Sequence, residues 1–196
     1  MVGLGNPGPR YAKTLHNVGA DVVALLAERY GERLRQGKEL AMTAEVRMGD
    51  RRVALAFPQT FMNGSGRSVA RLVRRYSVED LSKLVIVHDE LDLPLGTVRV
   101  KSGGGLAGHK GLRSVRDWLR SDEFVRVRIG IGKPPGGKES GVDHVLSVPS
   151  RLDRGTLASG VGTAAEAVEL LVSKGVAVAQ NEFNTRQAGP EPLNGP

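Results

Sequence analysis

The sequence predicts an α/β fold: a single-domain sandwich with a mixed, mostly parallel central sheet flanked by helices. Segments typical of strands alternate with segments typical of helices, as expected when helices cover both faces of a sheet. Residues 84–87 form an unbroken apolar run, which is typical of a central strand covered on both sides. The length of 196 residues fits one compact domain.

The first strand is predicted to end near Gly3, and only Met1 and Val2 precede that glycine. We expect that apolar residues added before Val2 would lengthen this strand, cover core side chains and stabilise the fold.

Gly3, Gly5 and Gly8 match the spacing G-x-G-x-x-G of dinucleotide-binding proteins. That motif needs a buried strand before the glycines and a helix directly after them. The strand is too short here, and residues 9–14 lack an apolar face at helical spacing. The sequence therefore argues against a dinucleotide site.

The remaining strands and helices follow from the period of the apolar residues. Residues 43–48 and 52–57 flank Gly49-Asp50 and are predicted to form a hairpin. Residues 96–100 and 125–129 alternate apolar and polar side chains, so each of these strands should have one face that is more exposed to solvent. Helical periodicity predicts helices at residues 18–30, 64–75, 111–120, 156–173 and about 175–185.

The folded domain is predicted to span residues 1–187. Residues 188–196 are rich in Pro and Gly, bury little apolar surface and are predicted to form a disordered tail. Residues 136–146 begin with glycines and continue with an amphipathic turn, which suggests a lid over a substrate groove.

Composition argues against several classes of protein. No apolar run approaches 18 residues, so no membrane span is expected, and the first residues lack the features of a secretory signal. The absence of Cys excludes disulfides, thiol nucleophiles and Cys-ligated zinc. It fits the reducing cytoplasm, where we expect the protein to reside.

The charge indicates a polyanionic partner, nucleic acid first, because the formal net charge is +7. Two predicted helices carry arginines on one side, which leaves a phosphate-binding surface and an ordinary solvated face equally open. These arginines are Arg67, Arg71, Arg74 and Arg75 on one helix, and Arg113, Arg116 and Arg120 on the other.

Four polar or glycine-rich segments are predicted near the ends of strands. In an open α/β sheet, ligands bind outside the carboxyl ends of the strands, so these segments are candidates for a shared site. They are Asn6 and residues 61–66, 88–92 and 103–111.

Six motifs occur in order between Val2 and about Arg186: GLGNPG (3–8), HNVG (16–19), PQTFMNGSG (58–66), HDELDLPLG (88–96), GHKG (108–111) and RVRIGIGKP (126–134). Together they resemble the bacterial peptidyl-tRNA hydrolase family. The resemblance implies a monomeric enzyme that hydrolyses the ester between a peptide and the 3′ ribose of tRNA, recycling peptidyl-tRNA dropped from ribosomes. It implies tRNA as the partner, no obligate protein partner, no membrane, and neither metal nor cofactor.

Ester hydrolysis without a visible Ser-His or Cys-His arrangement calls for an activated water. His16 is the predicted general base, because imidazole exchanges protons near neutral pH. A carboxylate on the far ring nitrogen would fix the tautomer and support the cation. The family motif points to Asp89 for that role, rather than to Glu90 or Asp92. Asn6 completes the predicted catalytic set as a fixed amide donor to the developing oxyanion.

The resemblance also implies contacts to the substrate. Lys101 and Arg128 match the positions that clamp the 5′-phosphate of tRNA. Tyr11 is expected to border the cleft, where its ring can stack on the terminal adenine. The predicted substrate-binding residues are Tyr11, Met62, Asn63, His109 and Lys110.

Lys110 stands where the family usually has an asparagine, and a lysine cannot accept a hydrogen bond. This departure leaves an alternative open: a catalytically impaired RNA-binding homologue. A metal hydrolase using His16, Asp89 and His109 is a weaker alternative, because no helical H-x-x-x-H spacing occurs.

Overall fold

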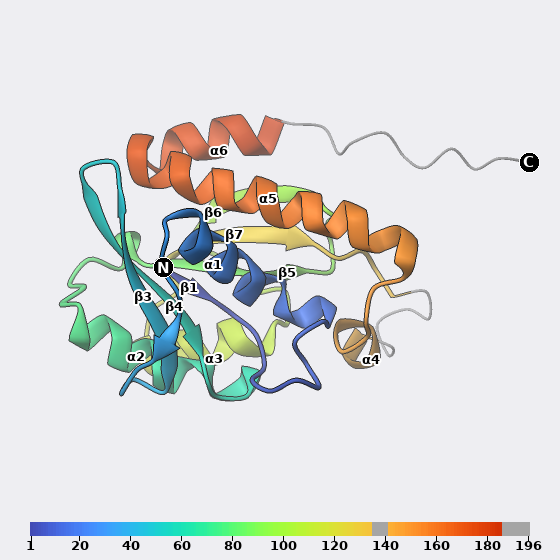
Figure 1. Ribbon diagram of the computed structural model, residues 1–196, viewed down its shortest axis with the longest axis horizontal. Helices are drawn as coiled ribbons and strands as arrows, with labels where there is room; N and C mark the ends of the chain where they lie inside the picture. Colours follow the sequence, from blue (N-terminus) through green and yellow to red (C-terminus); the bar gives the residue numbers. More distant parts are fainter. Residues whose placement is uncertain (135–140, 186–196) are drawn as a thin grey trace, which may run out of the picture.

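The computed structural model (Figure 1) describes residues 1–134 and 141–185. The predicted tail at 188–196 and residues 136–140 of the predicted lid lie outside the described residues. A seven-stranded sheet with the order β2-β3-β4-β1-β5-β7-β6 forms the centre. In chain order its strands are β1 (Val2–Gly3), β2 (Arg35–Gln36), β3 (Ala41–Met48), β4 (Arg51–Pro58), β5 (Val85–Glu90), β6 (Val98–Ser102) and β7 (Val125–Gly130).

The predicted mixed sheet is confirmed, but parallel pairs do not predominate. Within the described residues, β4, β1, β5 and β7 pair in parallel through the middle of the sheet. The three outer pairs, β2 with β3, β3 with β4 and β6 with β7, are antiparallel. The tight turn at Gly49, with φ of +63°, joins β3 directly to β4, so this pair needs no crossover helix.

Helices cover both faces of the sheet, as predicted (Figure 1). The predicted helix from residue 156 begins earlier in the structure, because the Ser150 hydroxyl caps it by accepting a hydrogen bond from the Asp153 N–H at 3.2 Å. One face carries α1 (Val18–Arg29), α5 (Arg151–Lys174) and α6 (Val176–Thr185), and the other carries α2 (Ser65–Arg75) and α3 (Lys110–Leu119). Shorter elements are η1 (Leu15–Asn17), η2 (Met62–Gly64), η3 (Leu81–Lys83) and α4 (Gly141–Val145).

Gly3 is explained by close packing of β1 against α1. A Cβ on Gly3 would lie only 2.0 Å from the carbonyl oxygen of Gly19. Gly8 has a φ of +95° and belongs to a turn rather than to the start of a helix. The glycine spacing therefore serves a strand–helix contact and a turn, which agrees with the argument against a dinucleotide site.

The amino end of β1 borders a cavity of about 650 Å³, lined partly by Met1, Val53, Leu72 and Leu171. The Met1 ammonium donates a hydrogen bond to the carbonyl oxygen of Ala54 at 2.7 Å. Met1 as a whole is partly exposed, but burial of its amino nitrogen lowers the pKa of that group to about 5. The short β1 strand thus leaves space and a titratable group inside the fold.

We expect that several apolar residues added before Met1 raise the melting temperature, because they would extend β1 and fill this cavity. A Gly/Ser extension of equal length is the control, and thermal unfolding is the measurement. The folded amine binds its proton less tightly than the unfolded one, so the stability of the unextended chain should rise between about pH 5 and 8. Equal melting temperatures for both extensions would contradict the expectation.

The outer strand β6 is covered along its free edge by a side chain of α6. Asn184 accepts a hydrogen bond from the Val100 N–H and donates one to the Val100 carbonyl oxygen, both at 2.9 Å. Arg99 adds a hydrogen bond to the Phe183 carbonyl oxygen at 2.7 Å. These contacts fasten the last described helix to the edge of the sheet.

Within residues 1–134 and 141–185, none of the helices has both the length and the apolar character needed to cross a membrane.

Candidate active site

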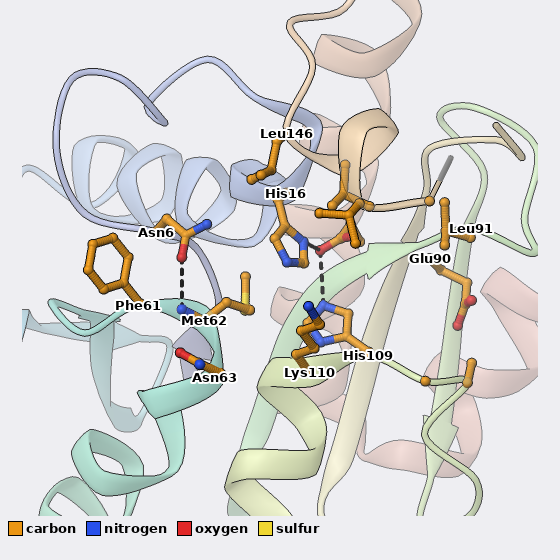
Figure 2. A pocket seen from close by; sticks show the side chains of 16 residues that line it. Asn6, His16, Phe61, Met62, Asn63, Glu90, Leu91, His109, Lys110 and Leu146 are labelled. Atoms are coloured by element: carbon orange, nitrogen blue, oxygen red, sulfur yellow. Dashed lines mark hydrogen bonds and ion pairs between the residues drawn. The ribbon is translucent and has the colours of Figure 1, made fainter. Parts of the chain in front are cut away.

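A cavity of about 350 Å³ opens where β1, β4 and β5 end (Figure 2). All four predicted strand-end segments contribute to its wall. It is lined by Asn6, His16, Phe61, Met62, Asn63, Asp89, Glu90, Leu91, Ala107, Gly108, His109, Lys110, Gly141, Val142, Val145 and Leu146.

His16 and Asp89 form a hydrogen-bonded pair in this cavity. His16 lies in η1, just before α1, and its Nδ1 is 2.8 Å from Oδ1 of Asp89 near the end of β5. A carboxylate only accepts, so Nδ1 carries the proton and Nε2 is left with its lone pair toward the cavity (Figure 2).

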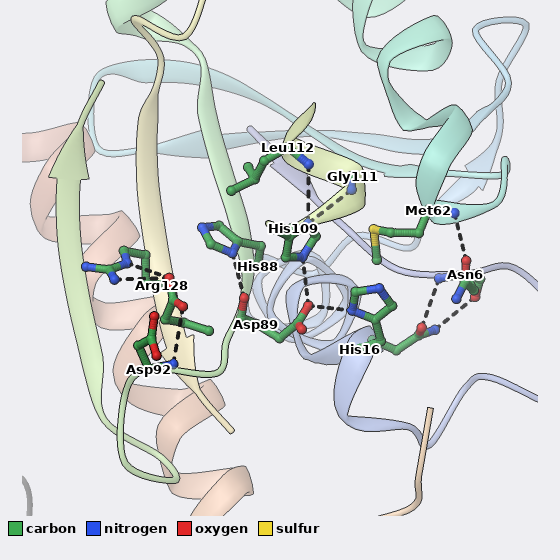
Figure 3. A network of polar contacts seen from close by, with 12 residues as sticks. Asn6, His16, Met62, His88, Asp89, Asp92, His109, Gly111, Leu112 and Arg128 are labelled. Carbon is green, nitrogen blue, oxygen red and sulfur yellow. Dashed lines mark hydrogen bonds and ion pairs between the residues drawn. The ribbon is translucent and has the colours of Figure 1, made fainter. Parts of the chain in front are cut away.

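His109 makes a second hydrogen bond to the same oxygen of Asp89 (Figure 3). It is the N-cap of α3, and its Nδ1 accepts from the backbone N–H groups of Gly111 and Leu112 at 3.1 and 3.3 Å. Nδ1 must therefore hold a lone pair, and Nε2 must carry the proton that it donates to Asp89 at 3.0 Å. The tautomer of His109 is fixed by a helix terminus.

Asp89 stays ionised although it is only 3% exposed. Burial by itself would raise the pKa of the carboxyl, but the attraction of His109 and His16 and their hydrogen bonds outweigh it and lower the pKa below its usual range. His88 lies behind the pair, with its ring 5.0 Å from that of His109. Burial lowers the pKa of His88 to about 3, so this imidazole is neutral at physiological pH.

The structure brings His16, Asp89 and His109 together, with one ligand atom of each within 4.8 Å of the others. These residue types can hold zinc, and the sequence spacing gave no sign that they converge from three elements. A neutral histidine that binds metal through Nε2 keeps its proton on Nδ1. Nδ1 of His109 already faces two N–H donors, so this geometry fits the hydrogen bonds rather than a metal ion.

Asn6 is held rigidly at the other side of the cavity. Its backbone N–H donates to Oδ1 of Asn17, and Asn17 Nδ2 donates back to the Asn6 carbonyl oxygen, both at 2.9 Å. The Asn6 side-chain oxygen accepts from the Met62 N–H at 2.7 Å. Because that oxygen is engaged, the amide nitrogen of Asn6 lies on the side facing His16 (Figure 2).

Arg126 supports the glycine-rich segment that leads to His109. Its side chain is buried and donates to the carbonyl oxygens of Gly103, Gly104 and Gly105. Burial lowers the pKa of this guanidinium. The conformation of residues 103–105, which lead toward α3, is therefore fixed by a buried side chain.

Three predicted substrate contacts lie outside the cavity wall. Tyr11 packs edge-on against Phe61, with ring centroids 6.2 Å apart. Lys101 and Arg128 lie on the same face of the β6–β7 pair, and Arg128 forms an ion pair with Glu90 at 3.0 Å. The other predicted site residues, Asn6, His16, Met62, Asn63, Asp89, His109 and Lys110, line the cavity.

Sequence reasoning missed the apolar wall of the cavity. Phe61 is 61% exposed and stands directly before Met62 and Asn63, so the motif that contains those residues already held the signal. Val142 and Leu146, from α4 and the residue after it, also line the cavity and belong to the predicted lid. No nucleophilic serine, threonine or cysteine is among the described residues that line the cavity.

The fold and site define a class of protein: an α/β protein with a hydrogen-bonded histidine–aspartate pair in a cavity at the carboxyl ends of its parallel strands. The model of the family "Peptidyl-tRNA hydrolase" matches residues 1–191. The chain is 50% identical over 182 residues to peptidyl-tRNA hydrolase of Mycolicibacterium vanbaalenii, covering 92% of this chain and 94% of that relative. The chain belongs to the peptidyl-tRNA hydrolase family.

Other relatives agree with this assignment. Peptidyl-tRNA hydrolase of Leifsonia xyli is 48% identical over 187 residues, covering 94% of this chain and 96% of that relative. The crystal structure of peptidyl-tRNA hydrolase from Acinetobacter baumannii is similar with a TM-score of 0.89 and 38% identity, covering 95% of this chain and 94% of that one.

Proposed function

We propose that this protein hydrolyses the ester bond between a peptide and the 3′ ribose of tRNA, and so recycles peptidyl-tRNA dropped from ribosomes. The observation that carries the proposal is the His16–Asp89 pair, which leaves Nε2 of His16 facing the cavity in a chain of this family. Since that substrate arises at ribosomes, we infer a cytoplasmic protein, and we propose that it acts as a monomer.

In the proposed mechanism, Nε2 of His16 takes a proton from a water molecule as the water oxygen attacks the ester carbonyl carbon. Asp89 stabilises the imidazolium that forms, through its hydrogen bond to Nδ1. The Asn6 amide nitrogen donates to the developing oxyanion. When the intermediate collapses, the ester bond breaks and the imidazolium returns its proton to the 3′ oxygen of the ribose.

The wall of the cavity suits a peptide joined to an adenosine. Asn63 is exposed in η2, just before α2, where its amide can pair with peptide N–H and carbonyl groups. Phe61, Val142 and Leu146 offer apolar surface to peptide side chains. Tyr11 extends that surface through its contact with Phe61, which suits stacking on the terminal base.

The arginine stripes on α2 and α3 support tRNA as the substrate. α3 begins at the cavity with Lys110, and α2 begins directly after η2, whose Met62 and Asn63 line the cavity. The arginines are exposed, but the stripes are not free of acids, because Arg75 pairs with Glu39 and Arg116 with Asp117. Phosphates of the acceptor arm can therefore follow these helices while the 3′ end enters the cavity.

The experiment that tests the function compares discharge of peptidyl-tRNA with discharge of aminoacyl-tRNA that has a free α-amine. We expect rapid release of the peptide and little release of the amino acid, because the cavity offers partners for a peptide amide. Equal rates would contradict the substrate class. Binding of tRNA with no discharge would favour the impaired homologue, for which neither the intact His16–Asp89 pair nor any relative gives support.

Lys101→Ala and Arg128→Ala are expected to weaken use of tRNA, because these cations are proposed to contact the 5′-phosphate. The loss should shrink with a substrate that lacks this phosphate, and also as salt rises. Lys174→Ala, at the exposed end of α5, is the matched control. The measurement is kcat/KM for both substrates. Variants that discriminate the 5′-phosphate as well as the parent protein would refute the clamp.

Lys110→Asn is expected to raise kcat modestly, because the ammonium lines the cavity and opposes the imidazolium of His16. The measurement is kcat against pH, with Lys83→Asn in η3 as control. Superimposable curves would remove Lys110 from the chemical step and leave it a surface contact.

A further inference from the structure

We propose that His109 is a positioning residue for the catalytic pair, rather than a contact to the substrate. It transmits the fixed geometry of the N-terminus of α3 to Asp89, and it limits how strongly Asp89 supports the His16 imidazolium. This inference rests on the proposed function, because it concerns the general base of that reaction.

The first step is that neither ring nitrogen of His109 is available to a substrate. Nδ1 accepts from the backbone N–H groups of Gly111 and Leu112, and Nε2 donates to Asp89. The side chain is only 7% exposed. His109 touches the cavity, but its polar atoms point into the protein.

The second step is that the N-terminus of α3 selects the tautomer of His109 that donates a hydrogen bond to Asp89. A lone pair on Nδ1 satisfies two of the N–H groups left without partners at the start of α3. Because a proton on Nδ1 would lose both contacts, the neutral Nε2–H form is selected. Arg126 holds the preceding glycines, so the donor reaches Asp89 from a fixed direction.

The third step is that His16 and His109 share one carboxylate oxygen, at 2.8 and 3.0 Å. A second donor on Oδ1 holds the carboxylate in one rotamer and withdraws part of its charge from His16. The lowered pKa of Asp89 agrees with this sharing, since the N–H groups that His109 and His16 direct at the carboxylate outweigh the effect of burial. His16 can then release its proton more readily to the departing 3′ oxygen.

No other charged group near the pair takes over this bond within the described residues. On β5, His88 is neutral and bonded to the Asp89 carbonyl oxygen, and Glu90 is paired with Arg128. Lys110 on α3 could donate to a carboxylate, but the ion pairs of Asp89 among the described residues are those with His16 and His109. On α4, Asp143 is exposed and His144 hydrogen-bonds to the Ile131 carbonyl oxygen.

Two variants separate the roles of His109, because each keeps one of its hydrogen-bonding functions and loses or weakens the other. The Oδ1 atom of an asparagine occupies nearly the place of imidazole Nδ1, so His109→Asn keeps the helix cap but cannot reach Asp89. The Nε2 atom of a glutamine occupies nearly the place of imidazole Nε2, so His109→Gln keeps the donor to Asp89 but weakens the cap. The measurements are melting temperature, and kcat and KM against pH, all on the full chain.

We expect His109→Asn to keep KM while kcat falls about tenfold, because the Asp89 carboxylate loses the contact that holds its rotamer and His16 releases its proton less readily. The melting temperature should also fall at neutral pH, because buried Asp89 loses a donor. On the acid side of the kcat–pH curve, this variant should lose activity at a higher pH than the parent protein. The reason is that Asp89, without the bond to His109, gives all of its support to the His16 imidazolium. We expect His109→Gln to keep most of kcat and the parent pH curve, while the melting temperature falls by about 2–4 °C.

An Asn variant with parent kcat and a superimposable pH curve would overturn the proposal and leave His109 a simple cap. A raised KM with unchanged kcat would restore the substrate contact expected from the sequence. The ¹⁵N chemical shifts of the imidazoles in the unaltered protein give a readout that needs no turnover. A proton on Nδ1 of His109 would refute the inference, whereas an inactive protein with the Nε2–H form would refute the proposed function instead.

Discussion

Replacing His16 with alanine is expected to lower kcat by on the order of 10²-fold or more, because the variant lacks the group that takes the proton from water. KM should change little, since the tRNA contacts proposed on α2, α3, β6 and β7 lie elsewhere. Discharge of peptidyl-tRNA under single-turnover conditions is the measurement that isolates the chemical step.

His144→Gln is the matched control for His16→Ala. His144 is also a histidine beside the opening, but its Nε2 hydrogen-bonds to the Ile131 carbonyl oxygen and it does not line the cavity. This variant should keep kcat within about threefold, as expected for a residue outside the reacting atoms. A chelator should leave the parent activity unchanged. A His16→Ala protein with turnover near that of the parent would contradict the mechanism.

Asp89→Asn is expected to lower kcat by at least tenfold, but less completely than His16→Ala. The amide oxygen can still accept from His16 and His109, so the shape of the site is kept, while the charge that supports the imidazolium is lost. Asp92→Asn is the control, because Asp92 is exposed outside the cavity lining.

Stability provides a second readout for Asp89. The pKa of Asp89 is below its usual range in the folded protein, so its ionised form stabilises the fold at neutral pH. That stabilisation is lost as pH falls below about 4, the usual pKa of the unfolded chain. Asp89→Asn should therefore lose less stability between neutral and acid pH than the parent protein. Equal kcat for Asp89→Asn and the parent would remove the carboxylate from the mechanism.

The sequence was sufficient to predict that four segments meet at one edge of the sheet, since the ends of parallel strands converge whatever the details of packing. The choice of Asn6, Asn63 and Asp89 within those segments depended on the resemblance to the family, and their roles stay predictions. The helices could be predicted for a similar reason, because apolar periodicity is a local property of the chain.

The partners of individual side chains could not be predicted, since they depend on tertiary register. Arg128 meets Glu90 because β5 and β7 are parallel neighbours, although 38 residues separate the two in sequence. His109 meets Asp89 only because the loop before α3 returns the chain to the end of β5. The share of antiparallel pairs was misjudged because β6 runs antiparallel to β7 although residues 103–124, with helix α3, connect them, and periodicity does not reveal the direction of such a pair.

The two hydrogen bonds between Asn184 and Val100 at the edge of β6 have a consequence for the synthesis of the chain. An outer strand with open N–H and carbonyl groups can recruit a strand from another molecule and start aggregation. Val100 and Asn184 are 84 residues apart, so a ribosome adding about 5–20 residues per second needs roughly 4–17 s to supply the protecting side chain. During that interval the nascent sheet has a template for intermolecular pairing, and α6, the last helix among the described residues, removes it.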